Sequence, residues 1–227
     1  MTDAVTCHAI ECEGETLELL GGRAIHWAAQ RTLFVADTHF GKPAAFRAAG
    51  VPVPELTTGA DLDRLTALIT RASAERLIIL GDVVHAPQGQ TQHTIEAIAD
   101  WRSTWRSLDV AYITGNHDRR VEPFPTEWRM TRLNPGTRLG PFTLHHDPTD
   151  DPDGYTLSGH IHPMIRLRDG VGAGVRCPCF LFEARHAILP AFGGFVGLAR
   201  VKPTPDARVF LIGPDQQVYP FTIPSHA

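Results

Sequence analysis

Cysteine, lysine and long apolar runs are all scarce in this chain of 227 residues. Four cysteines are too few for a disulfide-dense secreted scaffold, and neither pair has the two-residue spacing of a zinc knuckle. The N-terminal stretch MTDAVTCHAIECEGE is acidic where a secretory signal needs a basic start and an apolar run. The longest apolar stretch, residues 187–199, is shorter than a membrane span and contains Pro190. These absences predict reduced thiols, a cytoplasmic location and no membrane partner.

Basic residues are also few, and only Lys42 and Lys202 are lysine. The 21 basic and 25 acidic residues leave a formal net charge of −4. Such a chain has no overall basic surface for a polyanion, so a nucleic-acid site would have to be local or supplied by a metal. Histidine, in contrast, is abundant, with twelve residues against three tyrosines and four tryptophans. This excess is the feature that a functional interpretation has to explain.

The pattern of apolar residues predicts an α/β fold. Five apolar runs are typical of strands, and they end at Asp37, Asp82, Asn116, His146 and His160. Residues 62–69 and 95–105, between the first three runs, have the apolar periodicity of helices. Alternation of strand and helix predicts parallel pairing with crossover connections.

Two further segments have strand patterns of another kind. Residues 15–27 predict a hairpin with its turn at Gly21-Gly22. After Pro163 short alternating runs follow without a long helix, which predicts a second, mostly antiparallel sheet packed on the first. No internal repeat or linker divides the chain, so residues 1–227 are expected to form one domain.

Residues with metal-binding chemistry follow each of the five predicted strands. Because the carboxyl ends of parallel strands lie along one edge of a sheet, residues far apart in sequence can meet there. Aspartate and histidine bind divalent metals, and one carboxylate can bridge two cations. Each block alone also fits a cap, an Asx turn or a structural histidine, but five in order are not well explained by chance. The blocks are Asp37-Thr38-His39, Gly81-Asp82-Val83-Val84-His85, Gly115-Asn116-His117-Asp118, His145-His146 and Gly159-His160-Ile161-His162.

The order of these blocks closely resembles the signature of the calcineurin-like metallophosphoesterase superfamily. The resemblance runs from Asp37 to His162. It implies a four-layer αββα sandwich, with two mixed β-sheets flanked by helices and two divalent metal ions at one edge. Carried over by position, one metal would take Asp37, His39, Asp82 and His162. The other would take Asp82, Asn116, His145 and His160, with Asp82 bridging the two.

One position in this assignment is ambiguous, because His145 and His146 are adjacent. Neighbouring side chains of a strand point to opposite faces, so only one of the two is expected to be a ligand. We predict His145, since it falls where the family motif has its histidine.

The implied centre suits hydrolysis of a phosphate ester. Two ions about 3.5 to 4 Å apart can hold a bridging hydroxide for in-line attack on phosphorus, together with a substrate oxygen. Mixed imidazole, carboxylate and amide ligands favour manganese, with iron or zinc as alternatives, over magnesium. His117 takes no metal in this assignment. We therefore predict that it contacts a phosphate oxygen or protonates the leaving alkoxide, with Asp118 holding its ring.

Residues flanking the metal blocks discriminate between branches of the superfamily. Serine/threonine phosphatases carry aspartate, arginine and glycine after the second block and end the third block in glutamate, whereas this chain has His85-Ala86-Pro87 and Asp118. The first two blocks look instead like those of double-strand-break repair nucleases. In those enzymes the histidine at the position of His85 helps with the substrate phosphate.

A closer resemblance is to the DNA-ligase-associated metallophosphoesterases, small bacterial endonucleases linked with a repair ligase and helicase. It is carried by HFGKPAAFRAAGVPVPELTT from His39 to Thr58, by the third to fifth blocks, and by CPCFLF and LPAFGGF near the C-terminus. It implies a DNA endonuclease in DNA repair, with DNA as substrate. An ATP-dependent DNA ligase and a helicase are the protein partners that it implies.

Four basic residues near the blocks are candidate contacts for the phosphates of DNA: Lys42, Arg47, Arg119 and Arg120. Phe40 and Phe46 could stack on bases, although packing in the protein is the more common role of such residues. The chain shows no counterpart of the capping domain with which repair nucleases hold duplex ends. Single-stranded or distorted DNA is therefore the expected substrate.

Two other interpretations stay open. A small-molecule phosphodiesterase acting on cyclic nucleotides needs the same metal centre but no path for DNA. A non-catalytic repair adaptor would keep the fold and bind a partner, but such a protein is expected to have lost ligands. None of the predicted ligands is missing here.

Overall fold

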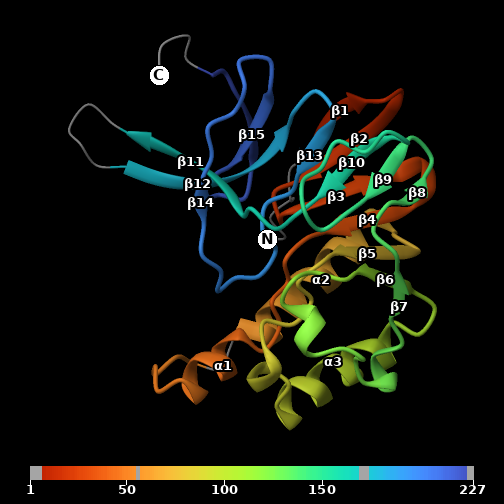
Figure 1. Cartoon of the computed structure of the whole chain (residues 1–227), viewed down its shortest axis with the longest axis vertical. Helices are drawn as coiled ribbons and strands as arrows, with labels where there is room; N and C mark the ends of the chain where they lie inside the picture. The colour runs from red at the N-terminus through yellow and green to blue at the C-terminus, as the bar shows by residue number, and fades with distance from the viewer. Residues whose placement is uncertain (1–6, 55–56, 169–173, 224–227) are drawn as a thin grey trace.

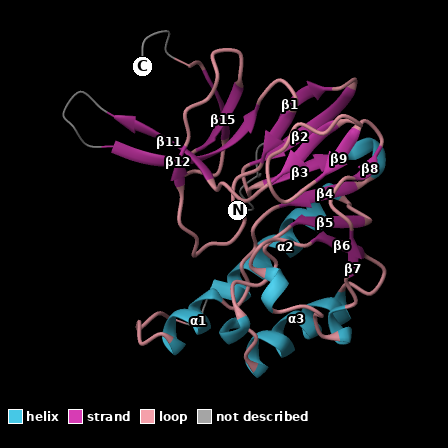
Figure 2. Cartoon of the chain, in the orientation of Figure 1, coloured by secondary structure: helices cyan, strands magenta, loops and turns pink. Residues whose placement is uncertain are grey.

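The computed structural model describes residues 7–54, 57–168 and 174–223. Two mixed β-sheets are packed against each other, and the α-helices lie along the outer side of the first sheet (Figures 1 and 2). The predicted sandwich of two mixed sheets is therefore confirmed. No described helix is long and apolar enough to cross a membrane.

The first sheet is formed by the N-terminal half of the chain, with its strands in sequence order. They are β1 (Cys7–Cys12), β2 (Glu15–Leu20), β3 (Ala24–Trp27), β4 (Thr32–Val35), β5 (Arg76–Leu80), β6 (Asp109–Ile113) and β7 (Thr131–Leu133). Strands β1 to β4 pair antiparallel and β4 to β7 pair parallel. The predicted hairpin is β2 and β3, where Leu20 pairs with Ala24 across the glycine turn.

Helices connect the parallel strands of this sheet. They are α1 (Lys42–Ala48), α2 (Thr57–Ala72) and α3 (Gln92–Thr104). The apolar stripe of α2, including Leu62, Leu65 and Leu68, is buried against residues such as Leu77 of β5. The Thr91 side chain caps α3 by accepting the Thr94 N–H at 3.2 Å. Both predicted helices are confirmed.

The second sheet takes the strands that follow β7. They are β8 (Thr137–Leu139), β9 (Phe142–Leu144), β10 (Tyr155–Ser158), β11 (Pro163–Arg168), β12 (Gly174–Phe182), β13 (His186–Ile188), β14 (Ala199–Arg200), β15 (Arg208–Ile212) and β16 (Val218–Phe221). Most of its pairs are antiparallel, while β10 pairs parallel with β9 and β13 and β11 pairs parallel with β14. The fourth and fifth predicted strands, β9 and β10, thus belong to this sheet, so the polar blocks come from both sheets.

The core lies between the two sheets, with a second apolar layer beneath the helices. The inter-sheet layer contains Trp27, Phe34, Phe142, Phe180 and Phe210. The outer face of the second sheet carries a third, smaller apolar cluster that includes Cys179 and Leu211. Partly buried residues of the chain, and no described helix, pack on that cluster. The described residues that follow β10 form strands and loops, so the described helices of the sandwich all lie on the first sheet.

Candidate metal centre

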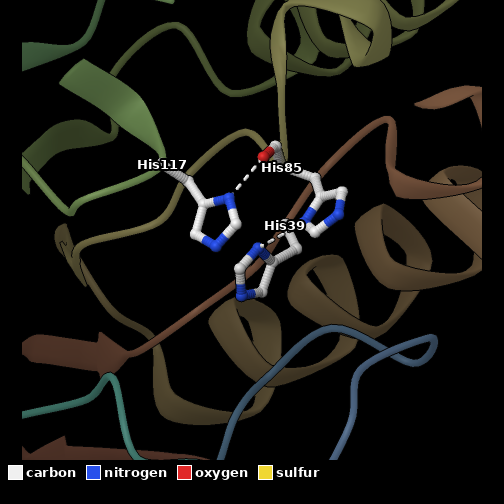
Figure 3. Close-up of side chains that lie close together, drawn as sticks. All are labelled: His39, His85 and His117. Atoms are coloured by element: carbon white, nitrogen blue, oxygen red, sulfur yellow. Dashed lines mark hydrogen bonds between the residues drawn. The ribbon is translucent and has the colours of Figure 1, made fainter. Parts of the chain in front are cut away.

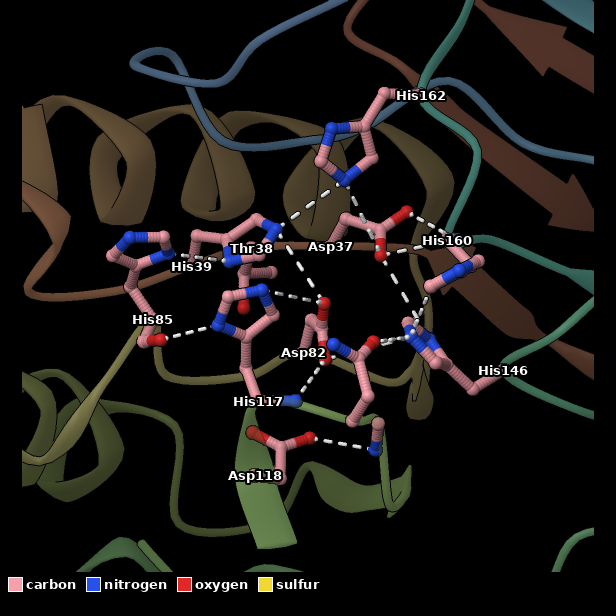
Figure 4. A network of polar contacts seen from close by, with 12 residues as sticks. Asp37, Thr38, His39, Asp82, His85, His117, Asp118, His146, His160 and His162 are labelled. Carbon is pink, nitrogen blue, oxygen red and sulfur yellow. Dashed lines mark hydrogen bonds and ion pairs between the residues drawn. The ribbon is translucent and has the colours of Figure 1, made fainter. Parts of the chain in front are cut away.

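The five polar blocks meet where loops from the two sheets converge (Figure 4). Asp37 and His39 follow β4, Asp82 follows β5, and Asn116 and His117 follow β6. The second sheet supplies the remaining histidines, which follow β9 and β10. The edge predicted from strand order is therefore an edge shared by two sheets.

One group of potential ligands consists of Asp37, His39 and His162, whose ligand atoms lie within 4.8 Å of one another. The Nε2 atoms of His39 and His162 are 3.3 Å apart, and His162 Nε2 is 3.7 Å from Asp37 Oδ1. Asp82 Oδ2 lies 3.6 Å from His39 Nε2. These four residues are the set predicted for the first metal.

A second group consists of Asp82, His146 and His160. His146 Nε2 lies 3.4 Å from Asp82 Oδ1, 3.1 Å from His160 Nδ1 and 3.0 Å from the side-chain oxygen of Asn116. Asp82 therefore faces both groups, one oxygen toward each, as expected of a bridging carboxylate. This group agrees with the set predicted for the second metal, except that His146 stands in place of His145.

The structure corrects the choice of His145. Its Nε2 is paired with Asp151 Oδ2 at 2.7 Å, away from the carboxylates of the centre. Phe142 and Leu144 of β9 face the core between the sheets, and residues two apart on a strand share a face. His146 therefore continues the face that looks toward the first sheet. The same alternation is visible in the sequence FTLHH and would have selected His146.

The backbone at the candidate ligands is in an unusual conformation. Left-handed φ angles are rare outside glycine and cost on the order of 1–3 kcal/mol each unless the surroundings impose them. Here they recur at five predicted ligands: Asp37 (54°), His39 (46°), Asp82 (50°), His160 (71°) and His162 (54°). Concentration of this strain at the ligands fits a site whose side chains must converge on bound ions.

Gly115 allows the close approach of two of these loops. A Cβ atom at this position would lie 2.1 Å from Asp82 Oδ1 and 2.3 Å from the Asp82 nitrogen. Any side chain there would displace the carboxylate that faces both groups. The glycine before Asn116 is therefore required by the geometry of the centre.

The donor set fits two divalent cations. Asp37 and Asp82 are 0% and 2% exposed, and within the described residues neither pairs with a lysine or arginine. Buried carboxylates without a cationic partner are costly. Burial also lowers the pKa of His39 far below its ordinary range, and His162 and Lys42 add to the shift. The neutral imidazole that results is the form that binds a metal.

A third cluster, His39, His85 and His117, lies beside the two ligand groups (Figure 3). The rings of His85 and His117 stack with centroids 4.8 Å apart. His117 Nδ1 donates to the backbone oxygen of His85, which leaves Nε2 3.9 Å from Asp82 Oδ2. The His117 side chain is 36% exposed. Its free ring nitrogen is thus accessible and faces the centre.

His85 contacts the centre through His39. The Nδ1 atoms of the two rings are 3.2 Å apart. Since His39 Nε2 faces the ligand groups, its Nδ1 carries the proton and donates to His85. Burial, together with Lys42 and His117, lowers the pKa of His85 to about 4, so its ring is a neutral acceptor. His85 therefore orients a ligand.

The predicted role of Asp118 is wrong. Its carboxylate accepts the N–H groups of Gly115 at 2.9 Å and Val84 at 3.1 Å and does not hold the His117 ring. The residue is fully buried, and burial raises its pKa to about 6 against these hydrogen bonds. Asp118 is a positioning residue that ties the loop after β5 to the loop after β6.

The predicted phosphate contacts fall into two groups. Lys42 begins α1 next to His39, and burial lowers its pKa against the attraction of Asp82. Arg119 and Arg120 are exposed on the short 3-10 turn Asp118–Arg120, directly after His117. The phosphate contacts of Lys42, Arg119 and Arg120 stay predictions.

Arg47 is placed differently from the other predicted contacts. Its Nη1 donates to the Val53 oxygen at 2.9 Å and so holds the segment that follows α1. Phe40 is 2% exposed in the core beside the helices, and it does not offer a ring to a base.

Asp61 of α2 was not anticipated from the sequence. It is 4% exposed and accepts the Gly194 N–H at 3.0 Å, across 133 residues. The same loop presents the Gly197 oxygen, which lies 2.8 Å from His162 Nδ1. Asp61 therefore supports a metal ligand from a distance, and no local pattern around it marks this role.

Comparison with known proteins agrees with this geometry. The family model for calcineurin-like phosphoesterases matches residues 30–169, which contain every predicted ligand. The chain belongs to this family. A calcineurin-like phosphoesterase is a metal-dependent hydrolase with a binuclear centre, as the two ligand groups also indicate.

Two solved structures are similar to this phosphoesterase, to different degrees. A nuclease MPE from Pseudomonas putida is 36% identical with a TM-score of 0.83, over 95% of this chain and 100% of that one. Yfce, a phosphoesterase from E. coli, is 16% identical with a TM-score of 0.44, over 85% and 99% of the two chains. Comparison with curated proteins gives no significant match.

Proposed function

We propose that this phosphoesterase is a DNA endonuclease that acts on single-stranded or distorted DNA with manganese in its centre. The observation that carries the proposal is the complete ligand set, combined with 36% identity to a nuclease along nearly the whole chain. Imidazole, carboxylate and amide donors without thiolates suit manganese, with iron or zinc as alternatives.

Two bound divalent cations supply Lewis acidity and charge neutralisation at phosphorus. Asp37, His39, Asp82 and His162 would hold one of them, and Asp82, Asn116, His146 and His160 the other. The chain's own residues then bind and orient the phosphate. His117, anchored through Nδ1 to the His85 oxygen, presents Nε2 to the site. In this proposal the doubly protonated His117 ring gives its Nε2 proton to the leaving alkoxide, while the oxygen of a water molecule bonds to phosphorus and the P–O bond to the alkoxide breaks.

The preference for single strands follows from the depth of the ligands. Asp37, His39 and Asp82 are at most 4% exposed, while the side chains of His117 and His160 are 36% and 37% exposed. A scissile phosphate would therefore reach the buried carboxylates from the side of these two rings. A flexible strand can bend to bring one phosphate inward, whereas duplex DNA resists bending over short lengths. Lys42, Arg119 and Arg120 would contact neighbouring phosphates from the rim.

A role in DNA repair is part of the same proposal. The resemblance to ligase-associated endonucleases suggests an ATP-dependent DNA ligase and a helicase as partners in the cytoplasm. Co-purification of such a ligase with the tagged protein from its own host would support this, and its absence from crosslinked samples would count against it.

The activity is tested with metal-stripped protein, circular single-stranded DNA and methyl para-nitrophenyl phosphate, each with and without manganese. We expect manganese-dependent cleavage of both substrates and a fall of about 10²- to 10⁴-fold in kcat for His117→Ala. Cleavage of the ester but not of the circle would favour a small-molecule phosphodiesterase. No manganese-dependent hydrolysis of either substrate would favour an adaptor.

A further inference from the structure

An apolar recess adjoins the candidate metal centre on the far side of His85. It has a volume of about 420 Å³, and its lining includes Phe46, Ala49, Val51, His85 and Gln88. Val51 is 45% exposed. The Val51 N–H donates to the Phe46 oxygen at 3.0 Å, so the chain after α1 folds back and places the two residues side by side.

Phe46 is the centre of this recess. Its half-buried ring lies 6.0 Å from the His85 ring and meets the Phe195 ring edge-on at 5.4 Å. Phe195 is itself 37% exposed. Lys42 Nζ lies 5.9 Å from the centroid of Phe46, which adds a cation to an otherwise apolar surface. We name Phe46, Val51 and Phe195 the aromatic shelf.

The aromatic shelf is connected to the metal centre at both of its ends. On one side His85 contacts the ligand His39 at 3.2 Å. On the other side Phe195 belongs to the loop that is bound to Asp37 through the Gly193 N–H and to His162 through the Gly197 oxygen. A group bound on the shelf is therefore held in a defined relation to the reacting phosphate.

We infer that the aromatic shelf binds a nucleobase of the DNA strand close to the scissile phosphate. This inference rests on the proposed endonuclease function. The flat face of a base stacks on an aromatic ring whatever its sequence. An accessible ring next to a phosphate-binding centre, with Lys42 beside it, offers the two kinds of contact that one nucleotide needs. Only an unstacked base can reach the ring, so the same contact would disfavour intact duplex.

The inference is tested with Phe46→Leu, which keeps an apolar side chain but removes the ring, and with Phe46→Trp, which keeps a ring. The substrates are a single-stranded oligonucleotide, the same strand with abasic sugars, and methyl para-nitrophenyl phosphate, all with the manganese-loaded full chain. Tyr219→Leu serves as a control, because Tyr219 is an exposed aromatic residue of β16 outside the site.

We expect Phe46→Leu to lower kcat/KM on the base-bearing strand by roughly 5- to 150-fold, the effect of one base–aromatic stack. Wild type and Phe46→Leu should cleave the abasic strand at equal rates and hydrolyse the ester equally. Phe46→Trp and Tyr219→Leu should retain wild-type rates on all three substrates.

Two results would overturn the inference while the endonuclease function stands. One is wild-type cleavage of the base-bearing strand by Phe46→Leu. The other is an equal loss on all three substrates, which would make Phe46 a structural residue. If wild-type protein hydrolyses the ester but cuts neither strand, the proposed function itself fails and the inference falls with it, a result visible before any variant is measured.

Discussion

The two sheets contribute different chemistry to the metal centre. The first sheet supplies both carboxylates, Asp37 and Asp82, together with the amide of Asn116. Of the second sheet's residues, those in the two ligand groups are all imidazoles: His146, His160 and His162. The charged donors thus come only from the parallel strands of the first sheet, which also supplies His39 and Asn116, whereas the second sheet adds imidazoles.

Hydrogen bonds attach loops of both sheets to the centre. Loops of the first sheet are bound directly to one another, since the His39 N–H donates to the Asp82 backbone oxygen at 2.8 Å and the His117 N–H to Asp82 Oδ1 at 3.0 Å. The second sheet's loops bond to the first sheet as well, through the His160 N–H on the Asp37 carboxylate at 2.9 Å and the Phe192 N–H on the Ala36 oxygen at 2.7 Å. The first sheet therefore fixes its own donors relative to one another, and the second sheet is attached at the same loops.

Asp82→Asn should have the largest effect, because Asp82 faces both ligand groups. We expect loss of both metals and a fall in kcat on the order of 10³-fold or more, from the loss of Lewis acid stabilisation. Elemental analysis and ester hydrolysis measure the two results, with the exposed Asp63→Asn of α2 as control. Two metals retained per chain would contradict the assignment of Asp82 as the bridge.

His146→Ala compared with His145→Ala tests the contribution of the second sheet. We expect His146→Ala to weaken the affinity for one manganese ion by more than about 100-fold. Loss of a residue that only hydrogen-bonds to a metal ligand already lowers metal affinity by about 10- to 100-fold. His145→Ala should leave metal affinity unchanged, because His145 pairs with Asp151 outside the centre. Manganese titration followed by calorimetry distinguishes the two. Equal losses in both variants would mean that β9 does not hold the register described.

Asp118→Asn tests the hydrogen bonds that join two loops of the first sheet. The substitution places an amide opposite the buried N–H groups of Gly115 and Val84 and leaves a donor unsatisfied, at a cost of roughly 1–3 kcal/mol. Urea unfolding of the metal-free protein measures this loss. Asp109→Asn, which removes the exposed pair with Arg76, should cost at most about 1 kcal/mol. A smaller effect for Asp118 than for Asp109 would refute its positioning role.

The smallest effect is expected from the cysteine thiols. Their reactivity compares the accessibility of one buried cysteine in each sheet, Cys12 and Cys179. Burial raises the pKa of Cys12 in β1 to about 11 and that of Cys179 in β12 to about 12, from an ordinary value of 9.0. A raised thiol pKa stabilises the fold below about pH 9, and this contribution is lost as the pH rises toward 12. At pH 8 a thiol reagent should modify the exposed Cys7 rapidly and the other three only on unfolding. Rapid modification of Cys179 would show that the second sheet opens more easily than described.

Local sequence patterns predicted much of the architecture. The apolar period of residues 62–69 predicted α2, and the run ending at Asp82 predicted β5, because burial of one face constrains which residues can stand there. The same patterns could not assign β9 and β10 to a sheet. Pairing partners depend on contacts between strands, which leave no signal within either strand.

The site shows the same division between local and tertiary information. Residue types at strand ends marked Asp37, Asp82 and His160 as candidates, since metal chemistry restricts the side chains that can serve. The resemblance to metallophosphoesterases then assigned each of them to a metal. His146 could have been chosen over His145 from the alternation in FTLHH. The role of Asp118 could not be predicted in this way, because it depends on how the loops after β5 and β6 approach each other.

The sequence alone therefore determined the chemistry of this protein: twelve histidines, seven of them in five blocks, and two aspartates placed where strands end. Only the tertiary structure decided which of these atoms face one another, that Asp61 supports His162 through a distant loop, and that the half-buried Phe46 ring lies 6.0 Å from the His85 ring. The physical reason is that donor type is a property of each residue. Convergence within a few ångströms is a property of two sheets packed together.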